Sequence, residues 1–477
     1  MSNKSHNPYK LLPFKSSSTW SQSLALPSDK GARYLSFMYQ WERSQWADPD
    51  AARRRMFGQL DFLLHAAFKH TPHYTRTLGK IGYDPSRNLD EDIWAKVPLL
   101  LRRDIQTNAK DLTPEITPRN QQPARKVNSS GSTGTPIEIL NPPIRGMLWS
   151  AATLHEHVLH NRGFDKKAAA IRVMKKTALG DQGSTMETWG TPFTEVFETG
   201  PATLFDIHQD PELQADWLIR ENPSYLLLFP SSLEALLPIL KDRRADLPAL
   251  EHFRTISEQL PADLREEVIN QTGRKIVDIY SAQEIGYIAF QCPEHDHYHL
   301  QQDLCFTEIL RDDGTPCKPG EIGRVVVTDP YNFVFPLIRY DIGDFAEMGE
   351  PCPCGRTQPV INRIMGRVRN LITLPDGSRH WPMTASKKFR EIAGINQFQL
   401  VQTSLQTIEA KFVCDHRLTQ EERLLLIGTI QDRLTYSFDV TISQVDEIAR
   451  GANGKFEEFK SNVTPEMVTT RESTEPV

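Results

Sequence analysis

Short apolar runs alternate with longer amphipathic stretches through the middle of the chain. Residues 168–173, 225–229 and 276–280 are mostly apolar runs with the length of a buried strand. The stretches at 231–240 and 262–272 instead have apolar side chains at helical spacing. Strands that alternate with helices in this way are typical of a mainly parallel sheet with helices on both faces. The pattern therefore predicts an α/β fold.

Cap residues mark where several helices should begin and end. Ser231 and Glu234 have the spacing of a capping box, so we expect a helix to begin at Ser231. Gly273 should end the next helix, because glycine readily adopts the conformation that closes a helix. Nearer the N-terminus, residues 30–68 are rich in aromatic side chains, arginine and alanine, which predicts long helices that cover one face of a larger domain.

After about residue 366 the hydrophobic pattern changes to that of a small, separate unit. Apolar and polar side chains alternate at 407–412 and 438–442, as in strands with one buried face. Between them, Thr419 and Glu422 form a capping box before apolar residues at four-residue spacing, which predicts a helix. We therefore predict two domains: residues 1–365 with the larger sheet, and residues 366–477 as a mobile α/β lid.

Composition and charge narrow the class of protein. The 477 residues are 39% hydrophobic and 24% charged, which is ordinary for a soluble globular chain. The net charge of −6 and the pI near 6.2 provide no overall basic character for nucleic acid or an anionic membrane. No apolar run approaches the ~20 residues that span a bilayer, and the N-terminus lacks a signal-peptide pattern. We expect a cytoplasmic protein whose partners are small molecules or other proteins.

A dense run of hydroxyls and glycines follows the basic pair Arg125 and Lys126. Such a loop can present backbone N–H groups and hydroxyls to phosphate oxygens. The chain lacks the Gly-Lys-Ser/Thr that ends a Walker loop, which disfavours a P-loop kinase or GTPase. A flexible Ser/Gly linker is the alternative interpretation. The residues predicted to contact phosphate are Ser129, Ser130, Gly131, Ser132, Thr133, Gly134 and Thr135.

Further segments occur in the order and at the spacing of one enzyme superfamily. The Ser/Gly loop resembles the phosphate-binding loop of adenylate-forming enzymes. Residues 280–284 resemble their aromatic-to-glutamate motif, residues 340–344 their ribose motif, and residues 454–456 their catalytic-lysine motif. Residues 366–369 match the hinge between their two domains. Ordered motifs of this kind are far more specific together than any one of them alone.

Two features narrow the resemblance to the phenylacetate-CoA ligase branch. A Cys-Pro-Cys-Gly-Arg element at 352–356 precedes the hinge, and residues 67–74 followed by 97–100 look like the N-terminal part of that branch. The likeness extends from about residue 35 to 465. It implies ATP, Mg²⁺, a carboxylic acid of the aryl or arylacetyl type, and CoA as the acyl acceptor. A homodimer would also fit the family.

Residue chemistry agrees with the roles that the resemblance implies. The Glu284 carboxylate could hold Mg²⁺ beside the ATP phosphates, and a surface salt-bridge partner is the alternative interpretation. Tyr280 offers a flat face to adenine, or is a core tyrosine, and Asp344 could accept both ribose hydroxyls. Lys455 lies in a glycine-rich loop from which it could bridge the acid and the α-phosphate. The remaining predicted contacts are Ser281, Gln283, Arg367 and Arg369.

The sequence departs from the family pattern at two positions. Gln283 replaces a hydroxyl that usually faces the α-phosphate, although its amide could still donate a hydrogen bond. The ribose motif has Asp341 where arginine is frequent, with Arg339 nearby. The acid pocket is expected near Trp149, Phe229 and Ile285, but spacing does not define its shape.

The cysteines predict a structural zinc site. Three cysteines and a histidine form a closed tetrahedral set that leaves no position for water. Unliganded cytosolic thiols are the alternative, because Cys-x-Cys is tighter than the usual zinc spacing. The arrangement resembles one found in members of the ligase branch. The predicted ligands are Cys292, His299, Cys352 and Cys354, with His297 or His295 as substitutes for His299.

Three functions remain open on the sequence. The first is an AMP-forming acid–CoA ligase. The second is an adenylating enzyme that passes its acyl group to a carrier protein or an amine. The third is a degenerate nucleotide-binding scaffold, which the joint presence of Glu284, Asp344 and Lys455 disfavours because a scaffold needs none of them.

Overall fold

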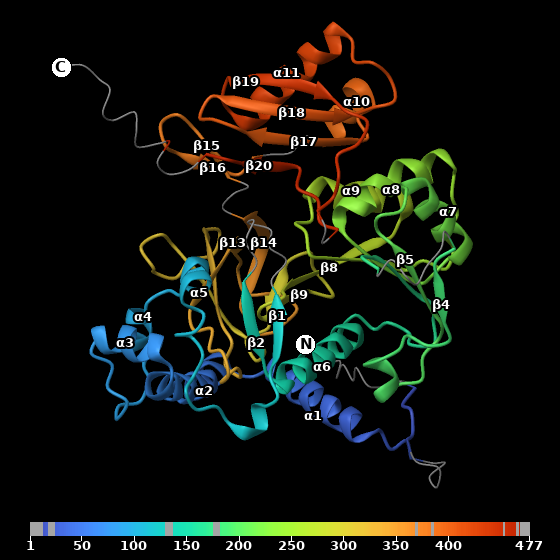
Figure 1. Ribbon diagram of the computed structural model, residues 1–477. Helices are drawn as coiled ribbons and strands as arrows, with labels where there is room; N and C mark the ends of the chain where they lie inside the picture. Colours follow the sequence, from blue (N-terminus) through green and yellow to red (C-terminus); the bar gives the residue numbers. More distant parts are fainter. Residues whose placement is uncertain are drawn as a thin grey trace, which may run out of the picture.

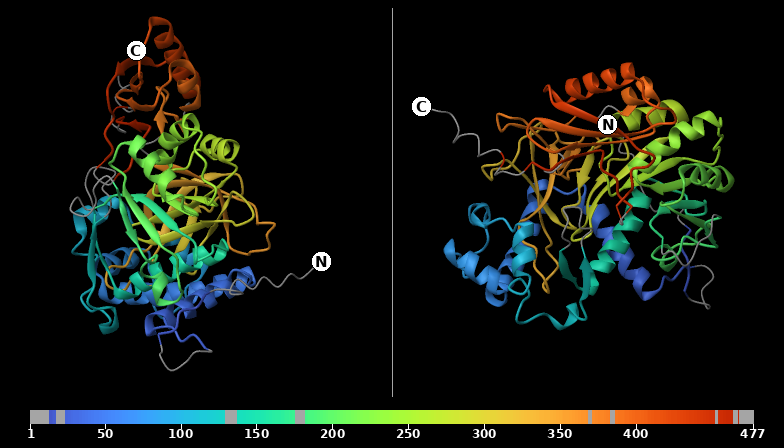
Figure 2. Two further views of the ribbon diagram at one scale, coloured as in Figure 1. Left: turned by 90° about the vertical axis from the view of Figure 1, so that its right-hand side faces the viewer. Right: turned by 45° about the horizontal axis from the view of Figure 1, so that its top comes forward.

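The computed structural model describes residues 13–17, 24–128, 137–174, 182–367, 371–382, 386–451, 454–463 and 467. A large α/β body fills the lower part of the view in Figure 1, and a smaller α/β unit from the C-terminal part of the chain lies above it. The left view in Figure 2 shows the same arrangement, with the N-terminal helices at the end of the molecule opposite the small unit. The predicted α/β fold class is confirmed.

A twelve-stranded sheet organises the described part of the large body, in the order β11-β12-β13-β14-β10-β9-β8-β7-β6-β3-β5-β4. Neighbouring strands are parallel from β8 through β7, β6 and β3 to β5. The strands from β8 to β11 along this order pair antiparallel. Their bounds are β3 (Ala168–Arg172), β4 (Ser184–Met186), β5 (Ala202–Asp206), β6 (Tyr225–Leu228), β7 (His252–Ile256), β8 (Lys275–Ala282), β9 (Gly286–Gln291), β10 (Tyr298–Leu300), β11 (Phe306–Leu310), β12 (Ile322–Thr328), β13 (Tyr340–Met348) and β14 (Val360–Arg367).

Helices cover both faces of this sheet. The long helical region near the N-terminus forms two helices, separated where Asp48 caps the second one and Pro49 occupies its first position. The body contains α1 (Asp29–Ser44), α2 (Pro49–His70), α3 (Pro72–Lys80), α4 (Glu91–Lys96), α5 (Arg102–Asn108), α6 (Pro143–Leu159), α7 (Pro211–Glu221), α8 (Pro230–Asp242) and α9 (Ala262–Thr272). A separate hairpin, β1 (Arg125–Asn128) with β2 (Glu138–Asn141), flanks the Ser/Gly loop.

The start of α8 differs from the prediction. The helix begins at Pro230 with Phe229 at its N-cap, so Ser231 lies inside the first turn and the predicted capping box is wrong. The Ser231 N–H group donates a hydrogen bond to the Glu258 carboxylate, 3.1 Å away, which replaces the cap that its own helix would have supplied. The next prediction is confirmed, because α9 ends at Gly273, whose φ is +65°.

The small unit has its own sheet and hydrophobic core. Its strands lie in the order β19-β18-β17-β20, and the helix α11 begins with the predicted capping box of Thr419 and Glu422. Phe389, Phe412 and Ile430 are fully buried between the sheet and the helices. The boundary at residue 366 stays a prediction. The elements are β15 (Ile372–Thr373), β16 (Arg379–His380), α10 (Ser386–Ala393), β17 (Gln397–Gln402), β18 (Thr407–Val413), α11 (Gln420–Leu434), β19 (Asp439–Gln444) and β20 (Phe459–Ser461).

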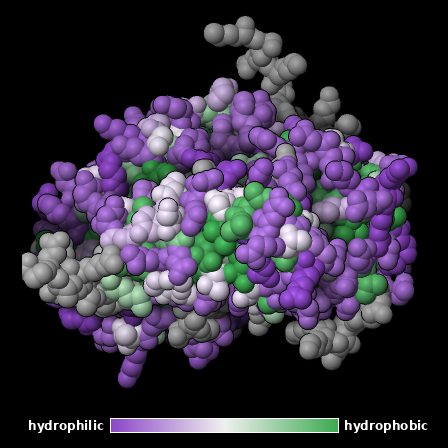
Figure 3. Space-filling model, turned by 90° about the horizontal axis from the view of Figure 1, so that it is seen from above, coloured by the Kyte–Doolittle hydropathy of each residue, from purple (hydrophilic) through white to green (hydrophobic). Residues whose placement is uncertain are grey.

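The surface over the small unit is mostly hydrophilic, with a hydrophobic strip near the centre of the view (Figure 3). Among the described helices, none combines the length and the apolar character needed to cross a bilayer.

Candidate active site

Tyr280 near the end of β8 and Asp344 in β13 meet through their side chains. The Tyr280 hydroxyl donates a hydrogen bond of 2.8 Å to one Asp344 carboxylate oxygen, and the Arg367 Nε lies 3.3 Å from the other. Asp344 and Arg367 are direct partners in the β13–β14 ladder, so strand register fixes this ion pair. Burial raises the pKa of Asp344, although Arg367, Tyr280 and Lys455 each oppose that rise. The three predicted residues therefore form one polar cluster.

Glu284 lies in the turn between β8 and β9 and is 8% exposed. Its carboxylate faces Arg102 at the start of α5, with 3.5 Å between Nη1 and Oε1. Arg102 was not predicted from the sequence. Because it comes from a distant part of the chain, no motif around Glu284 indicates it. Its guanidinium places a positive charge beside Glu284, where anionic phosphate oxygens could also be bound.

Lys455 reaches this cluster from the small unit. Burial lowers the pKa of its ammonium, and Arg367 lowers it further, while Asp344, Glu258 and Glu284 oppose the shift. These charges come from separate segments of the chain, so Lys455 lies within electrostatic range of the predicted nucleotide-binding residues Glu284, Asp344 and Arg367. Convergence of Glu284, Asp344 and Lys455 is what the predicted chemistry requires.

The segment that carries Lys455 is seated against the large body. The Arg450 guanidinium donates a hydrogen bond of 2.6 Å to the Ser231 hydroxyl, and the Phe456 N–H donates one of 2.7 Å to Glu258. Gly454 has a φ of +74°, and a Cβ there would lie 2.8 Å from Val173 and 3.4 Å from Phe229. A larger residue at this position would therefore push the lysine segment away from the sheet.

Several predicted contacts are not part of this geometry. Ser129 to Thr135 and Arg369 lie outside the described residues, although β1 and β2 place the two ends of the Ser/Gly loop side by side. Ser281 is half-buried in β8, and Gln283 is exposed in the turn that follows.

Aromatic side chains line the region beyond Glu284 in which the acid pocket was expected. Trp149 of α6 and Tyr287 of β9 have ring centroids 4.6 Å apart, and the Tyr287 hydroxyl lies 3.0 Å from Thr153 Oγ1. Gly286 between Glu284 and this pair has a φ of +103°, and a Cβ there would lie 2.6 Å from the Arg145 guanidinium. The positive φ favours glycine at this position, and a side chain there would displace the Arg145 guanidinium.

A second cluster gathers predicted metal ligands around the ends of β9, β10 and β14, which are neighbouring inner strands of the large sheet. Cys292, His297, His299 and Cys352 each present a donor atom, and these atoms lie within 4.8 Å of one another. Cys354 lies beside this set, with its Sγ 3.6 Å from His299 Nε2 and 3.4 Å from an Arg356 nitrogen. The group therefore contains three of the four predicted ligands, Cys292, His299 and Cys352. The fourth member is His297, which was predicted as a substitute for His299, and the predicted ligand Cys354 lies next to the group.

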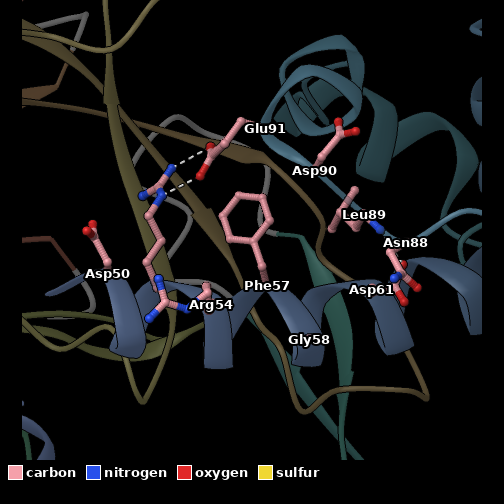
Figure 4. A pocket seen from close by; sticks show the side chains of 10 residues that line it. Asp50, Arg54, Phe57, Gly58, Asp61, Asn88, Leu89, Asp90 and Glu91 are labelled. Carbon is pink, nitrogen blue, oxygen red and sulfur yellow. Dashed lines mark hydrogen bonds and ion pairs between the residues drawn. The ribbon is translucent and has the colours of Figure 1, made fainter. Parts of the chain in front are cut away.

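An open pocket of about 620 Å³ lies elsewhere, between α2 and the segment that leads into α4 (Figure 4). Asp50, Asp61, Asp90 and Glu91 surround its mouth. Its lining contains none of the predicted site residues, and Glu91 is already paired with Arg53 across it. We assign this pocket no part in the chemistry.

Comparisons with known proteins agree with this geometry. A family model for the CapK C-terminal domain matches residues 374–462. A phenylacetate-coenzyme A ligase of Thermus thermophilus is 23% identical over 336 residues, which are 66% of this chain and 70% of that protein. An indoleacetate–CoA ligase of Aromatoleum aromaticum is 25% identical over 243 residues, covering 50% of this chain and 44% of its own length.

Among solved structures, a 2-hydroxyisobutyryl-CoA ligase in the postadenylation state superposes with a TM-score of 0.69 at 17% identity, over 95% of this chain and 96% of that one. At this identity the superposition establishes the fold, and the sequence likeness comes from the curated relatives. The chain has the fold of the adenylate-forming ligases and resembles the phenylacetate-CoA ligases in sequence.

Proposed function

We propose that the chain is an AMP-forming acid–thiol ligase that activates a carboxylic acid with ATP and transfers the acyl group to CoA. The observation that supports this most strongly is the convergence of Glu284, Asp344, Arg367 and Lys455 around one site. A carboxylate for Mg²⁺, a carboxylate for ribose and a cation for the α-phosphate are the groups that adenylation needs.

In the first step, an oxygen of the acid attacks the α-phosphorus, and the bond from that phosphorus to pyrophosphate breaks. Lys455 would stabilise the negative charge that develops on the α-phosphate, and Arg367 would hold the nucleotide near Asp344. Glu284 would bind Mg²⁺, which neutralises phosphate charge when present. In the second step, the thiol sulfur attacks the acyl carbon, and the bond to AMP breaks. Rotation of the small unit about Arg369 would remove Lys455 and admit the thiol.

An aryl or arylacetyl acid fits the aromatic residues beyond Glu284. Trp149 is 39% exposed and its ring lies against Tyr287, so part of this aromatic pair is accessible to a flat substrate. Two relatives are named for phenylacetate and indoleacetate, whose aromatic rings match this class. A carrier protein or an amine as acyl acceptor is the second candidate, because the proposed adenylation site would be the same for either acceptor.

An acid-dependent ATP–pyrophosphate exchange assay tests the proposed function. We expect exchange with at least one aryl or arylacetyl acid, and formation of a CoA thioester when CoA is added. Exchange without a thioester would favour a carrier protein or an amine as acceptor. Wild-type protein that exchanges with no acid in a broad panel would contradict adenylation altogether.

We also propose that zinc occupies the cysteine and histidine cluster as a structural clip. Structural zinc prefers a group of four thiolate and imidazole donors. The cluster shares no residue with the proposed active site. Arg356, which contacts Cys354, also donates a hydrogen bond of 3.0 Å to Gln45 and lies over Trp46. The ion would therefore tie two sheet loops to the turn between α1 and α2.

Replacing Cys352 with serine is expected to remove bound zinc and to lower the midpoint of thermal unfolding, because a metal bound only to the folded state stabilises it. Elemental analysis and a thermal melt of the purified protein measure both effects. Cys414→Ser is the matched control, since Cys414 lies in the small unit and hydrogen-bonds to the His416 carbonyl. Unchanged zinc content in Cys352→Ser would contradict the site.

A further inference from the structure

Glu258 lies in the loop that follows β7 and contacts the lysine segment directly. One carboxylate oxygen accepts the Phe456 N–H at 2.7 Å, and the other accepts the Ser231 N–H at 3.1 Å. Its side chain is 7% exposed. A buried carboxylate that is shared between a helix start and a segment of another unit is costly unless both contacts are made.

The same segment is held by a second residue, Arg450. Its guanidinium lies 3.9 Å from the Glu258 carboxylate, donates to the Ser231 hydroxyl, and donates to the Gly454 carbonyl at 3.3 Å. Ser231 is available for this contact because Glu258, rather than Ser231, caps α8. The first turn of α8 therefore contacts the lysine segment instead of capping itself: the Ser231 N–H donates to Glu258, and the Ser231 hydroxyl accepts from Arg450.

The backbone around Glu258 supports a functional rather than a purely structural role. Ser257 has a φ of +77°, a left-handed conformation that side-chain-bearing residues rarely adopt. Gln259, on the other side, approaches the hinge, because a Cβ on Gly366 would lie 2.8 Å from its Oε1. Adjacent residues therefore contact both the lysine segment and the start of the hinge.

We propose that Glu258 is a positioning residue that receives the lysine segment through Phe456 and Arg450 and so sets Lys455 in place for acyl-AMP formation. This inference rests on the proposed function. Glu258 acts through the segment rather than on substrate, and the segment leaves it when the small unit rotates. Its contribution is therefore confined to the first half-reaction.

Glu258→Ala is expected to lower ATP–pyrophosphate exchange by about 10- to 100-fold, because a displacement of about 1 Å at a catalytic group costs rates of this order. Thioester formation from supplied acyl-AMP should remain within about twofold of wild type, since Lys455 has no task in that step. ATP–pyrophosphate exchange by Glu258→Gln should lie between that of wild type and that of Glu258→Ala, because the amide oxygen still accepts one of the two N–H groups. Hydrogen exchange at the Phe456 amide should become faster in Glu258→Ala.

The matched control is Glu266→Ala, which removes an exposed carboxylate from α9. Two results for Glu258→Ala would overturn the inference while leaving the proposed function intact. One is an equal loss in both half-reactions. The other is ATP–pyrophosphate exchange and amide protection of Phe456 that both match wild type. Wild-type protein that exchanges with no acid would overturn the proposed function, and this inference with it. Glu258→Gln keeps the test decisive if the alanine variant fails to fold.

Discussion

Lys455→Ala is expected to lower acyl-AMP formation by about 10²- to 10³-fold, the usual effect of removing one preorganised donor from a developing charge. The ammonium lies among Glu284, Asp344 and Arg367, and alanine supplies no charge in its place. Thioester formation from supplied acyl-AMP should be largely retained. ATP–pyrophosphate exchange and a coupled thioester assay measure the two steps separately.

The pH dependence of the first step provides a second measurement on the same variant. Burial and Arg367 lower the pKa of Lys455, so its ammonium is lost at a lower pH than that of an exposed lysine. Acyl-AMP formation should therefore fall as the pH rises through this lowered pKa, and Lys455→Ala should lack that decline. Lys411→Ala on β18 is the matched control. Loss of both half-reactions to the same extent in Lys455→Ala would contradict its role.

The elements of the fold could be predicted because strand length, helical spacing and caps are local properties of the sequence. The capping box at Thr419 and Glu422 and the end of α9 at Gly273 depend on residues within one turn of each other. The start of α8 could not be predicted in this way. Pro230 takes the first helical position, and the group that caps the helix is Glu258, which lies in another part of the chain.

The candidate site was predictable where one short motif carries its own chemistry. Tyr280, Glu284, Asp344 and Lys455 each stand in such a motif, and the fold brings these motifs together. Arg102 was missed because nothing local distinguishes it from other surface arginines until α5 is folded against β13. The antiparallel half of the sheet was missed for a similar reason, since an apolar run does not reveal the direction of its neighbour.

Buried polar residues at the C-terminal end of α6 and at its C-cap, His160, are another feature that the sequence does not reveal. His155, Glu156, His157 and His160 look like a solvated stretch, yet all four are buried. The helix lies between α1 and the sheet, which removes water from every side of its C-terminal turn (Figure 1). A sequence-based interpretation would assign these side chains to the surface, because charged residues are seldom fully buried unless they are paired.

Glu156→Ala is expected to lower the free energy of unfolding of the large body by about 3–5 kcal/mol, because it leaves buried charges without their partner. Glu156 is 1% exposed and lies 2.8 Å from Arg162 and 2.6 Å from Arg254. Removing its single carboxylate therefore strands two guanidinium groups in the interior. Denaturant unfolding followed by tryptophan fluorescence reports on this region, since every tryptophan except Trp381 precedes residue 366.

The pH dependence of the stability difference distinguishes the loss of a buried charge from the loss of packing around a cavity. Burial alone would raise the pKa of Glu156, but Arg162 and Arg254 outweigh burial and hold that pKa well below its usual range. A carboxyl with a lowered pKa contributes stability above its unfolded pKa and loses it as the pH falls through the folded value. The difference between wild type and Glu156→Ala should therefore be full at neutral pH and shrink only in strong acid.

Glu91→Ala is the matched control, because Glu91 also pairs with an arginine but is 57% exposed. An exposed pair of this kind contributes about 0–1 kcal/mol, since water and salt screen its charges. If Glu156→Ala lowered the free energy of unfolding by no more than Glu91→Ala does, the buried cluster would not hold α6 against the sheet. The four buried polar residues at the end of α6 and its C-cap would then be tolerated in the interior rather than required there.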